Sequence, residues 1–352
     1  MKKIWWGGLA LVLAGSLSGY FMMPQKSPYH LDYKHVALNI LLEYSEYLAK
    51  PQYVGEIYLA QDMAKEMAKY GVTAKVYTLE DTYSNLGFNE GYELYLRPLP
   101  ELRFPRYHDV FDKDRIAVLF ETFPYSLDEV KNADIIFTGS LKKNKEYRKL
   151  GLNSYFLPQF TRFDKFYPAP KDEFKRKILF VGNQWPGLPT RPTILLAKKT
   201  GLEIDIFGGN HDDELSGEYA HLWKGKQIAG DDLKYYYSSA DIVLNDTRAD
   251  MIEAGFISNR IFDVTACKGF LISDYIPEIE EIYGDAIPMY KNEDEFKRLI
   301  EYYLAHPEER REKAERAYKI TKERFGADKI IPQMLQYMEA YRRQQGFKGA
   351  EN

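Results

Sequence analysis

The chain has 352 residues, a length that favours two folded domains over one hydrophobic core. Hydrophobic residues make up 45% and charged residues 28%, which excludes a disordered or collagen-like chain. The net charge of -4, from 52 acidic and 48 basic residues, gives no general electrostatic attraction for nucleic acid. Cys267 is the only cysteine, so an intramolecular disulfide and a Cys-based zinc site are both excluded.

The N-terminus, residues 1–26, has the pattern of a targeting or anchoring segment. Lys2 and Lys3 precede an uncharged stretch at residues 4–23, which contains small residues at 14–16. This pattern fits a secretory signal peptide or a membrane anchor, because about twenty apolar residues span a bilayer. A third interpretation is that the protein starts near Met23. Lysines flank the stretch on both sides, so charge does not decide its orientation.

Residues 27–160 are predicted to form a Rossmann-like domain, because short apolar runs alternate with longer amphipathic ones. A helix is expected at 55–70, where apolar residues recur near a 3.6-residue period and Gly71 provides the stop. The expected strands are 36–41, 74–79, 92–96, 115–120, 134–138 and 155–157.

A linker is predicted at residues 161–176, which place Pro168 and Pro170 among charged and aromatic residues. Residues 177–325 then alternate again, which predicts a second doubly wound domain. Its expected strands are 177–181, 203–207, 241–245, 270–273 and 286–290, with helices at 192–200, 231–239, 258–267, 277–283 and 293–305. Residues 326–352 are predicted to be a C-terminal helix and tail, with a break near Gly326.

Polar residues and glycines follow several of these strands, at the edge where open α/β sheets bind ligands. Gly182 and Asn183 follow the strand at 177–181, and Gly208 follows the strand at 203–207. Asn245 ends the strand at 241–245. A glycine lets backbone N–H groups approach a phosphate, although tight turns at these positions explain the same residues.

The segment around Ser258 is the strongest candidate for an anion site. Ser258 or Asn259 can cap the next helix, whose free N–H groups and positive dipole end suit a diphosphate. Arg260 can add a charge-assisted contact to phosphate, and Asp263 can accept hydrogen bonds from vicinal hydroxyls. The alternative is a surface ion pair between Arg260 and Asp263, three residues apart on the helix.

The same region resembles the C-terminal domain of GT-B glycosyltransferases, specifically the CgeB-like, spore-protein-type, family 1/4-like group. The matching text is L-F-V-G-N at 179–183, I-V-L-N at 242–245, M-I-E-A-G-F-I-S-N-R-I-F-D-V-T-A-C-K-G-F-L-I-S-D at 251–274, I-P-M-Y at 287–290 and E-F-K-R-L-I-E-Y-Y-L-A-H-P-E-E-R at 295–310. The resemblance covers about residues 177–325. The N-terminal half matches in architecture alone.

The resemblance implies an α/β fold with two Rossmann-like doubly wound domains, a central cleft and a C-terminal helix that crosses back. It implies that the C-terminal domain binds a nucleotide-sugar donor, with Asp263 at the ribose and Ser258 and Arg260 beside the diphosphate. Gly255 stands where many GT-B enzymes have a second acidic residue, so a carboxylate role at the transferred sugar is in doubt.

Glu121, which follows the strand at 115–120, is the candidate catalytic base, and His108 is a weaker one. An apolar strand end raises the pKa of a carboxyl, which suits a proton acceptor, although a plain polar strand end is the alternative. No metal-ligand cluster is visible, and the resemblance implies an enzyme that needs neither metal nor cofactor.

We therefore expect a hexosyltransferase-like enzyme that uses a nucleotide-sugar donor and a glycan, lipid-linked or protein acceptor, for example at the cell surface. The alternatives are a secreted two-domain solute-binding protein, which would cross between its domains several times, and a transferase-like protein that binds without catalysis. Membrane association through the N-terminus is expected. Donor supply favours the cytoplasmic face, and the N-terminal segment favours export.

Overall fold

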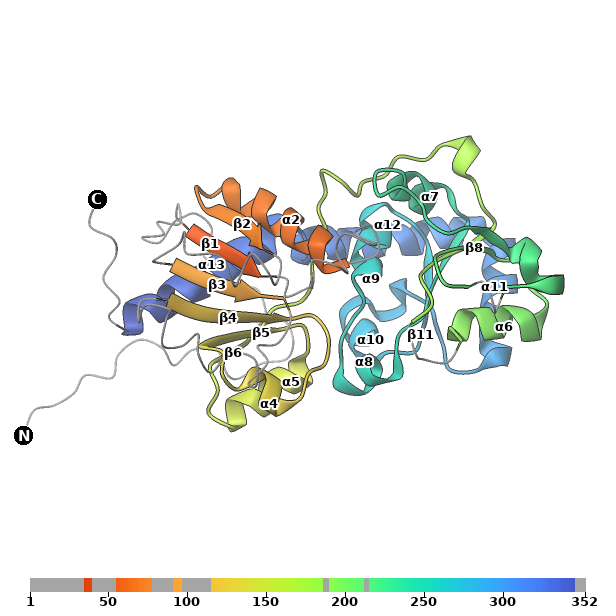
Figure 1. Ribbon diagram of the computed structural model, residues 1–352. Helices are drawn as coiled ribbons and strands as arrows, with labels where there is room; N and C mark the ends of the chain where they lie inside the picture. Colours follow the sequence, from red (N-terminus) through yellow and green to blue (C-terminus); the bar gives the residue numbers. More distant parts are fainter. Residues whose placement is uncertain are drawn as a thin grey trace, which may run out of the picture. The chain divides into compact units, whose positions relative to one another are not determined.

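The computed structural model describes residues 35–39, 55–77, 91–96, 115–185, 190–211 and 215–345. The N-terminal segment 1–26 and the candidate His108 lie outside these residues. Within them, no helix is both long enough and apolar enough to cross a membrane. The described chain forms two six-stranded sheets whose paired strands all run parallel (Figure 1).

The first sheet has the strand order β2-β1-β3-β4-β5-β6. Its strands are β1 (His35–Asn39), β2 (Thr73–Tyr77), β3 (Gly91–Tyr95), β4 (Arg115–Glu121), β5 (Ile135–Thr138) and β6 (Ser154–Phe156). All six predicted strands are confirmed to within two residues. Every residue of β5 is buried, as expected for a parallel strand covered on both faces.

Three helices lie between the strands of this sheet along the described part of the chain: α2 (Gly55–Ala68), α4 (Leu127–Val130) and α5 (Leu141–Lys149). The sequence predicted α2 and missed the other two. Helix α5 buries a single side chain, Tyr147, so its sequence lacks the apolar stripe by which a helix is identified.

The second sheet has the order β12-β11-β10-β7-β8-β9. Its strands are β7 (Ile178–Val181), β8 (Asp205–Phe207), β9 (Trp223–Gly225), β10 (Ile242–Asn245), β11 (Leu271–Asp274) and β12 (Met289–Tyr290). Four of the five predicted strands are confirmed to within two residues, and the fifth, predicted at 286–290, is a strand only at Met289 and Tyr290. The short edge strand β9 was not predicted. The strand order reverses between β7 and β10, and ligands of such sheets bind at the carboxyl ends of the strands beside this reversal.

The helices of the second half surround this sheet (Figure 1). They are α6 (Pro192–Thr200), α7 (Leu233–Ser239), α8 (Ala249–Ala254), α9 (Asn259–Ala266), α10 (Pro277–Tyr283), α11 (Glu293–Ala305) and α12 (Pro307–Arg324), with 3-10 turns η3 (Asp172–Phe174), η4 (Gly217–Leu222) and η5 (Gly284–Ala286). Helix α9 buries Ile261, Phe262 and Val264, and the Phe262 ring lies 4.8 Å from that of Phe325. This packing fixes the position of the start of α9.

The last helix, α13 (Ala327–Gln345), returns to the first sheet (Figure 1). Its buried residues Ile330, Ile331, Met334, Leu335 and Met338 share a core with α2 and β5. The predicted break is confirmed, because α12 ends at Arg324 and α13 begins at Ala327. The first sheet therefore draws part of its core from the end of the chain.

Truncation of this core from α13 tests the packing. Leu335 is completely buried, so Leu335→Ala is expected to lower the free energy of unfolding by about 2–5 kcal/mol. The neighbouring Gln336 is exposed, and Gln336→Ala should change it by less than about 0.5 kcal/mol. Urea denaturation measures both, and equal effects of the two variants would contradict the packing of α13 on the first sheet.

Candidate functional site

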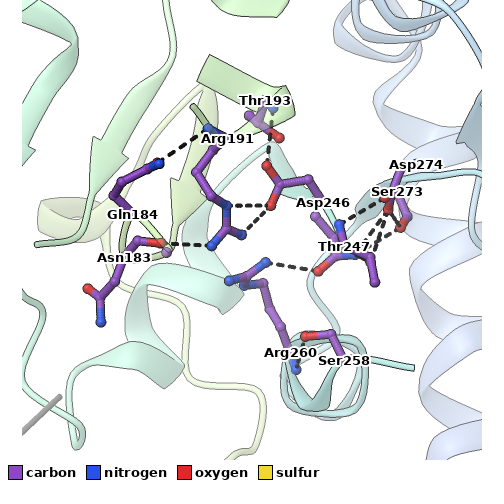
Figure 2. A network of polar contacts seen from close by, with 12 residues as sticks. Asn183, Gln184, Arg191, Thr193, Asp246, Thr247, Ser258, Arg260, Ser273 and Asp274 are labelled. Carbon is purple, nitrogen blue, oxygen red and sulfur yellow. Dashed lines mark hydrogen bonds and ion pairs between the residues drawn. The ribbon is translucent and has the colours of Figure 1, made fainter. Parts of the chain in front are cut away.

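A network of polar side chains occupies the carboxyl edge of the second sheet, at the reversal of strand order (Figure 2). Its residues come from the ends of β7, β10 and β11 and from the starts of α6 and α9. They are Asn183, Gln184, Arg191, Thr193, Asn245, Asp246, Thr247, Ser258, Arg260, Ser273 and Asp274.

Arg191 and Asp246 form a buried ion pair at the centre of this network. Asp246 accepts a hydrogen bond of 3.0 Å from Nε of Arg191, a second from its Nη2, and one of 3.1 Å from the backbone N–H of Thr193. Burial lowers the pKa of Arg191, and the charge of Asp246 opposes that shift. The charge of Arg191 is therefore compensated within the protein.

Arg191 also fixes the loop after β7. Its Nη1 donates to the carbonyl oxygen of Asn183 over 2.8 Å, and its guanidinium lies 3.8 Å from the centre of the Trp185 ring. The amide oxygen of Asn183 accepts from the backbone N–H of Gly209 over 2.8 Å. The loops after β7 and β8 are thus tied together and to the start of α6.

Arg260 lies at the start of α9. Ser258 is confirmed as the helix cap, because its Oγ accepts from the backbone N–H of Arg260 over 3.4 Å. Nη1 of Arg260 donates to the amide oxygen of Asn245 over 2.9 Å. Among the acids that the structure describes, none forms an ion pair with Arg260. A half-buried cation and the positive end of a helix therefore stand together without a compensating carboxylate.

Asn245 connects Arg260 to a second buried acid. Its amide nitrogen donates to Oγ of Ser273 over 3.0 Å, and Asp274 accepts from that hydroxyl over 2.9 Å and from the backbone N–H of Thr247 over 2.8 Å. Burial raises the pKa of Asp274 to about 6, although these hydrogen bonds oppose the shift. The orientation of Asn245, and through it that of Arg260, is set by several bonds.

Gly182 and Gly208 leave room for these contacts. A Cβ on Gly208 would lie 2.0 Å from the carbonyl oxygen of Gly182, so the two loops approach each other too closely for any side chain. A Cβ on Gly182 would lie 3.0 Å from Nη2 of Arg260 and 3.2 Å from Nη2 of Arg191. Both guanidinium groups therefore lie close to Gly182. Figure 2 shows the two arginines next to each other.

Asn259 and Asp263 lie next to this network, on the same helix. Asp263 accepts from the hydroxyl of Thr161 over 2.7 Å and from the amide of Asn259 over 3.0 Å. The alternative ion pair between Arg260 and Asp263 is not formed. Burial raises the pKa of Asp263 to about 7. The buried Tyr237 is close to both, since Arg260 lowers its pKa and Asp263 raises it, while burial has the largest effect.

Glu121 lies apart from the network, at the end of β4 in the first sheet. Its side chain is completely buried, and it accepts from the hydroxyl of Tyr147 over 2.9 Å and from the backbone N–H of Tyr125 over 3.2 Å. Burial raises its pKa. These bonds are typical of an acid that holds a loop in place, and the catalytic role of Glu121 stays a prediction. The described residues contain no cluster of three or more metal-ligating side chains.

The structure places six of the predicted site residues in or beside the polar network, and their role in binding stays a prediction. They are Gly182, Asn183, Gly208, Asn245, Ser258 and Arg260. It missed Arg191, Asp246, Thr247, Ser273 and Asp274. A signal for the acids was present, because Asp246 and Asp274 follow or end a buried strand of the predicted sheet. Asp246 is the first residue after β10, and Asp274 is the last residue of β11.

The comparisons with known proteins agree with this architecture. A sequence profile of the glycosyl transferase-like family matches residues 168–336. Over 230 residues the chain is 26% identical to the spore protein CgeB of Bacillus subtilis. The alignment covers 58% of this chain and 68% of CgeB.

Solved GT-B structures share the fold at low sequence identity. Sucrose-phosphate synthase from Thermosynechococcus elongatus superimposes with a TM-score of 0.63 at 12% identity, over 90% of this chain and 100% of the other. A glycosyltransferase from Rickettsia africae gives 0.60 at 11% identity, over 88% and 98%. HepE of Anabaena, in complex with UDP and glucose, gives 0.58 at 9% identity, over 88% and 100%.

Substitution of Asp246 tests how much the buried ion pair with Arg191 contributes to stability. Asp246→Asn leaves the charge of Arg191 buried without its partner, which typically costs about 3–5 kcal/mol in the free energy of unfolding. Asp285 pairs with Lys313 and Arg316 at the surface, so Asp285→Asn is the control and should cost less than about 1 kcal/mol. Urea denaturation compares the two, and a loss no larger than the control's would refute a central role for Asp246.

The raised pKa of Asp263 predicts a dependence of stability on pH. The ordinary value is 3.8 and the folded value about 7, so the folded protein binds the proton more tightly. The stabilisation is complete below about pH 4 and is lost as the pH rises through about 7. Between pH 5 and pH 8 the wild type should lose on the order of 2 kcal/mol relative to Asp263→Asn. Urea denaturation at both values checks this, with the exposed Asp231→Asn as control.

Proposed function

We propose that this chain, whose residues 168–336 match the glycosyl transferase-like family, transfers a sugar from a nucleotide-sugar donor bound at the carboxyl edge of the second sheet. The GT-B fold and the family support the reaction class. The donor and its contacts are part of this proposal. They rest on the polar network at the reversal of strand order, where the sheet presents the ends of β7 and β10.

The diphosphate of the donor is placed at the start of α9. The observation that carries this step is that Arg260, beside the capped end of α9, has no acid partner among the described residues. Backbone N–H groups and the helix dipole favour negative charge at this end, and a guanidinium makes bidentate contacts to phosphate oxygens. The same groups would stabilise the charge that develops on the diphosphate when the bond to the sugar breaks.

Arg191 has a different part in the proposal. Because Asp246 neutralises it, Arg191 contributes little net charge, and its bond to the loop after β7 keeps Gly182 close to both guanidinium groups. Arg260 supplies the net charge. A cation and a helix end at this place perform the charge neutralisation that a metal ion performs in other enzymes, which supports the proposal of metal-independent transfer.

Asp263 is proposed to bind the ribose of the nucleotide. It lies one helical turn after Arg260, so both side chains belong to the same face of α9. Each of its carboxylate oxygens accepts one hydrogen bond inside the protein and has capacity for another. UDP is the nucleotide bound in the HepE structure, which makes UDP the first ligand to test.

The connectivity favours this proposal over the secreted solute-binding protein. Strands β1 to β6 all lie in the first sheet and β7 to β12 all lie in the second, so the strands cross between sheets once. The helix α13 then returns to the first core. A solute-binding protein was expected to cross several times.

Nucleotide binding in solution tests the proposal. UDP, GDP and CDP are compared by thermal shift and calorimetry, and one of them is expected to stabilise the wild type, by about 2.7 kcal/mol at a hundredfold excess over Kd. Arg260→Ala should weaken binding by about 10- to 100-fold, since hydrogen bonds to charged groups contribute about 1.5–3 kcal/mol. Arg260→Lys should retain part of the affinity, because the charge remains without the bidentate geometry.

The exposed Arg298→Ala on α11 is the matched control and should bind the nucleotide as the wild type does. Free glucose and amino acids are tested beside the nucleotides. Stabilisation by these small solutes, with no response to any nucleoside diphosphate, would refute the transferase and support the solute receptor.

A further inference from the structure

Thr161 stands where the chain leaves the first sheet and where it later returns. Its backbone N–H donates to the carbonyl oxygen of Phe325 over 2.9 Å, and its own carbonyl oxygen accepts from Ala327 over 2.8 Å. Thr161 and Gly326 therefore form a bridge of parallel strand type. The side chain of Thr161 is buried. With the backbone groups used by the bridge, the hydroxyl is left for another partner.

That partner is Asp263 of α9. The hydroxyl of Thr161 donates to Oδ1 of Asp263 over 2.7 Å, and the amide of Asn259 donates to Oδ2 over 3.0 Å. The two residues that form this bond are 102 positions apart in the sequence. One donor on each oxygen fixes the rotation of the carboxylate plane about its bond to Cβ, which a single bond would not do.

The neighbouring charged groups do not orient the carboxylate of Asp263. Asp62 and Lys165 lie near Asp263 and shift its pKa in opposite directions, but Asp62 is paired with Arg162 over 2.6 Å and with Lys165 over 3.3 Å. No ion pair to Asp263 is formed by the described residues. The orientation of its carboxylate therefore depends on two neutral, directional hydrogen bonds.

We propose that Thr161 is a positioning residue for the ribose: its hydroxyl orients Asp263 so that the carboxylate accepts from the vicinal 2′- and 3′-hydroxyls of the donor nucleotide. The inference rests on the proposed function and specifies what that site selects. Vicinal hydroxyls point in fixed directions, so a carboxylate accepts from both only when its plane is set correctly. The preference for a ribonucleotide over its 2′-deoxy analogue is thus determined by a residue of the crossing between the sheets.

The experiment measures this preference by calorimetry. The nucleoside diphosphate that binds the wild type best, UDP in the first instance, is compared with its 2′-deoxy analogue and with inorganic pyrophosphate. The wild type is expected to prefer the ribonucleotide by about tenfold, as for loss of one hydrogen bond to a charged acceptor. Thr161→Val keeps the shape and removes the hydroxyl, and it should reduce the preference to below about threefold while pyrophosphate binds as before.

A second variant of Thr161 distinguishes a role in positioning Asp263 from a role in the backbone bridge to Gly326. Thr161→Ser retains the hydroxyl and should restore the preference, whereas a role confined to the bridge would leave the preference unchanged in both variants. Arg260→Ala should weaken both nucleotides equally and keep their ratio. Thr200→Val, the same chemical change on α6, should match the wild type, because its hydroxyl bonds only within its own helix.

The possible results distinguish the proposed roles of Thr161, Asp263 and Arg260. A ribose preference that persists in Thr161→Val overturns the inference and leaves the transferase proposal intact. A wild type that binds the nucleoside diphosphate without any ribose preference overturns the roles of both Thr161 and Asp263, while that of Arg260 stands. If no nucleoside diphosphate binds at all, the proposed function fails, and the inference fails with it.

Discussion

The buried carboxylate of Asp246 is the contact on which the geometry of the second sheet's edge depends. It follows β10, it bonds the first turn of α6 through Thr193, and through Arg191 it reaches the loop after β7. Without this acid, the guanidinium of Arg191 would be an uncompensated charge in a buried position. Strands β7 and β10 are paired along their length, and the side chain of Asp246 joins the end of this pair to the helix that follows β7.

Two arginines, Arg191 and Arg260, lie beside Gly182 in this arrangement, and they have different roles. Asp246 neutralises Arg191, which connects the loops after β7 and β10. Arg260 is bonded to the neutral amide of Asn245, so its charge is not compensated by that contact. The amide of Asn245 is itself oriented by Ser273 and Thr247. A cation that is positioned without being neutralised is the property that an anion site requires, because reorganisation is then small when the anion binds.

The sequence predicted the strands well, since parallel strands covered on both faces appear as continuous apolar runs between turn residues. It predicted that Ser258 and Arg260 lie at the start of a helix, because the residues that cap a helix are close together in the sequence. It did not predict the pairing of Arg191 with Asp246, 55 positions away, because that contact depends on β7 and β10 being neighbours in the sheet. The bond from Thr161 to Asp263 was missed for the same reason. Helices α4 and α8 and strand β9 were too short to show a period.

The position of α13 bears on the synthesis of the protein. Strands β1 to β6 are made first, yet Ile330, Ile331 and Leu335 complete their core from the last part of the chain. At ribosomal rates of about 5–20 residues per second, the apolar face of the first sheet waits roughly ten seconds or more after β6 emerges. The first sheet therefore lacks part of its core, and remains open to chaperones and to aggregation, until α13 has been made.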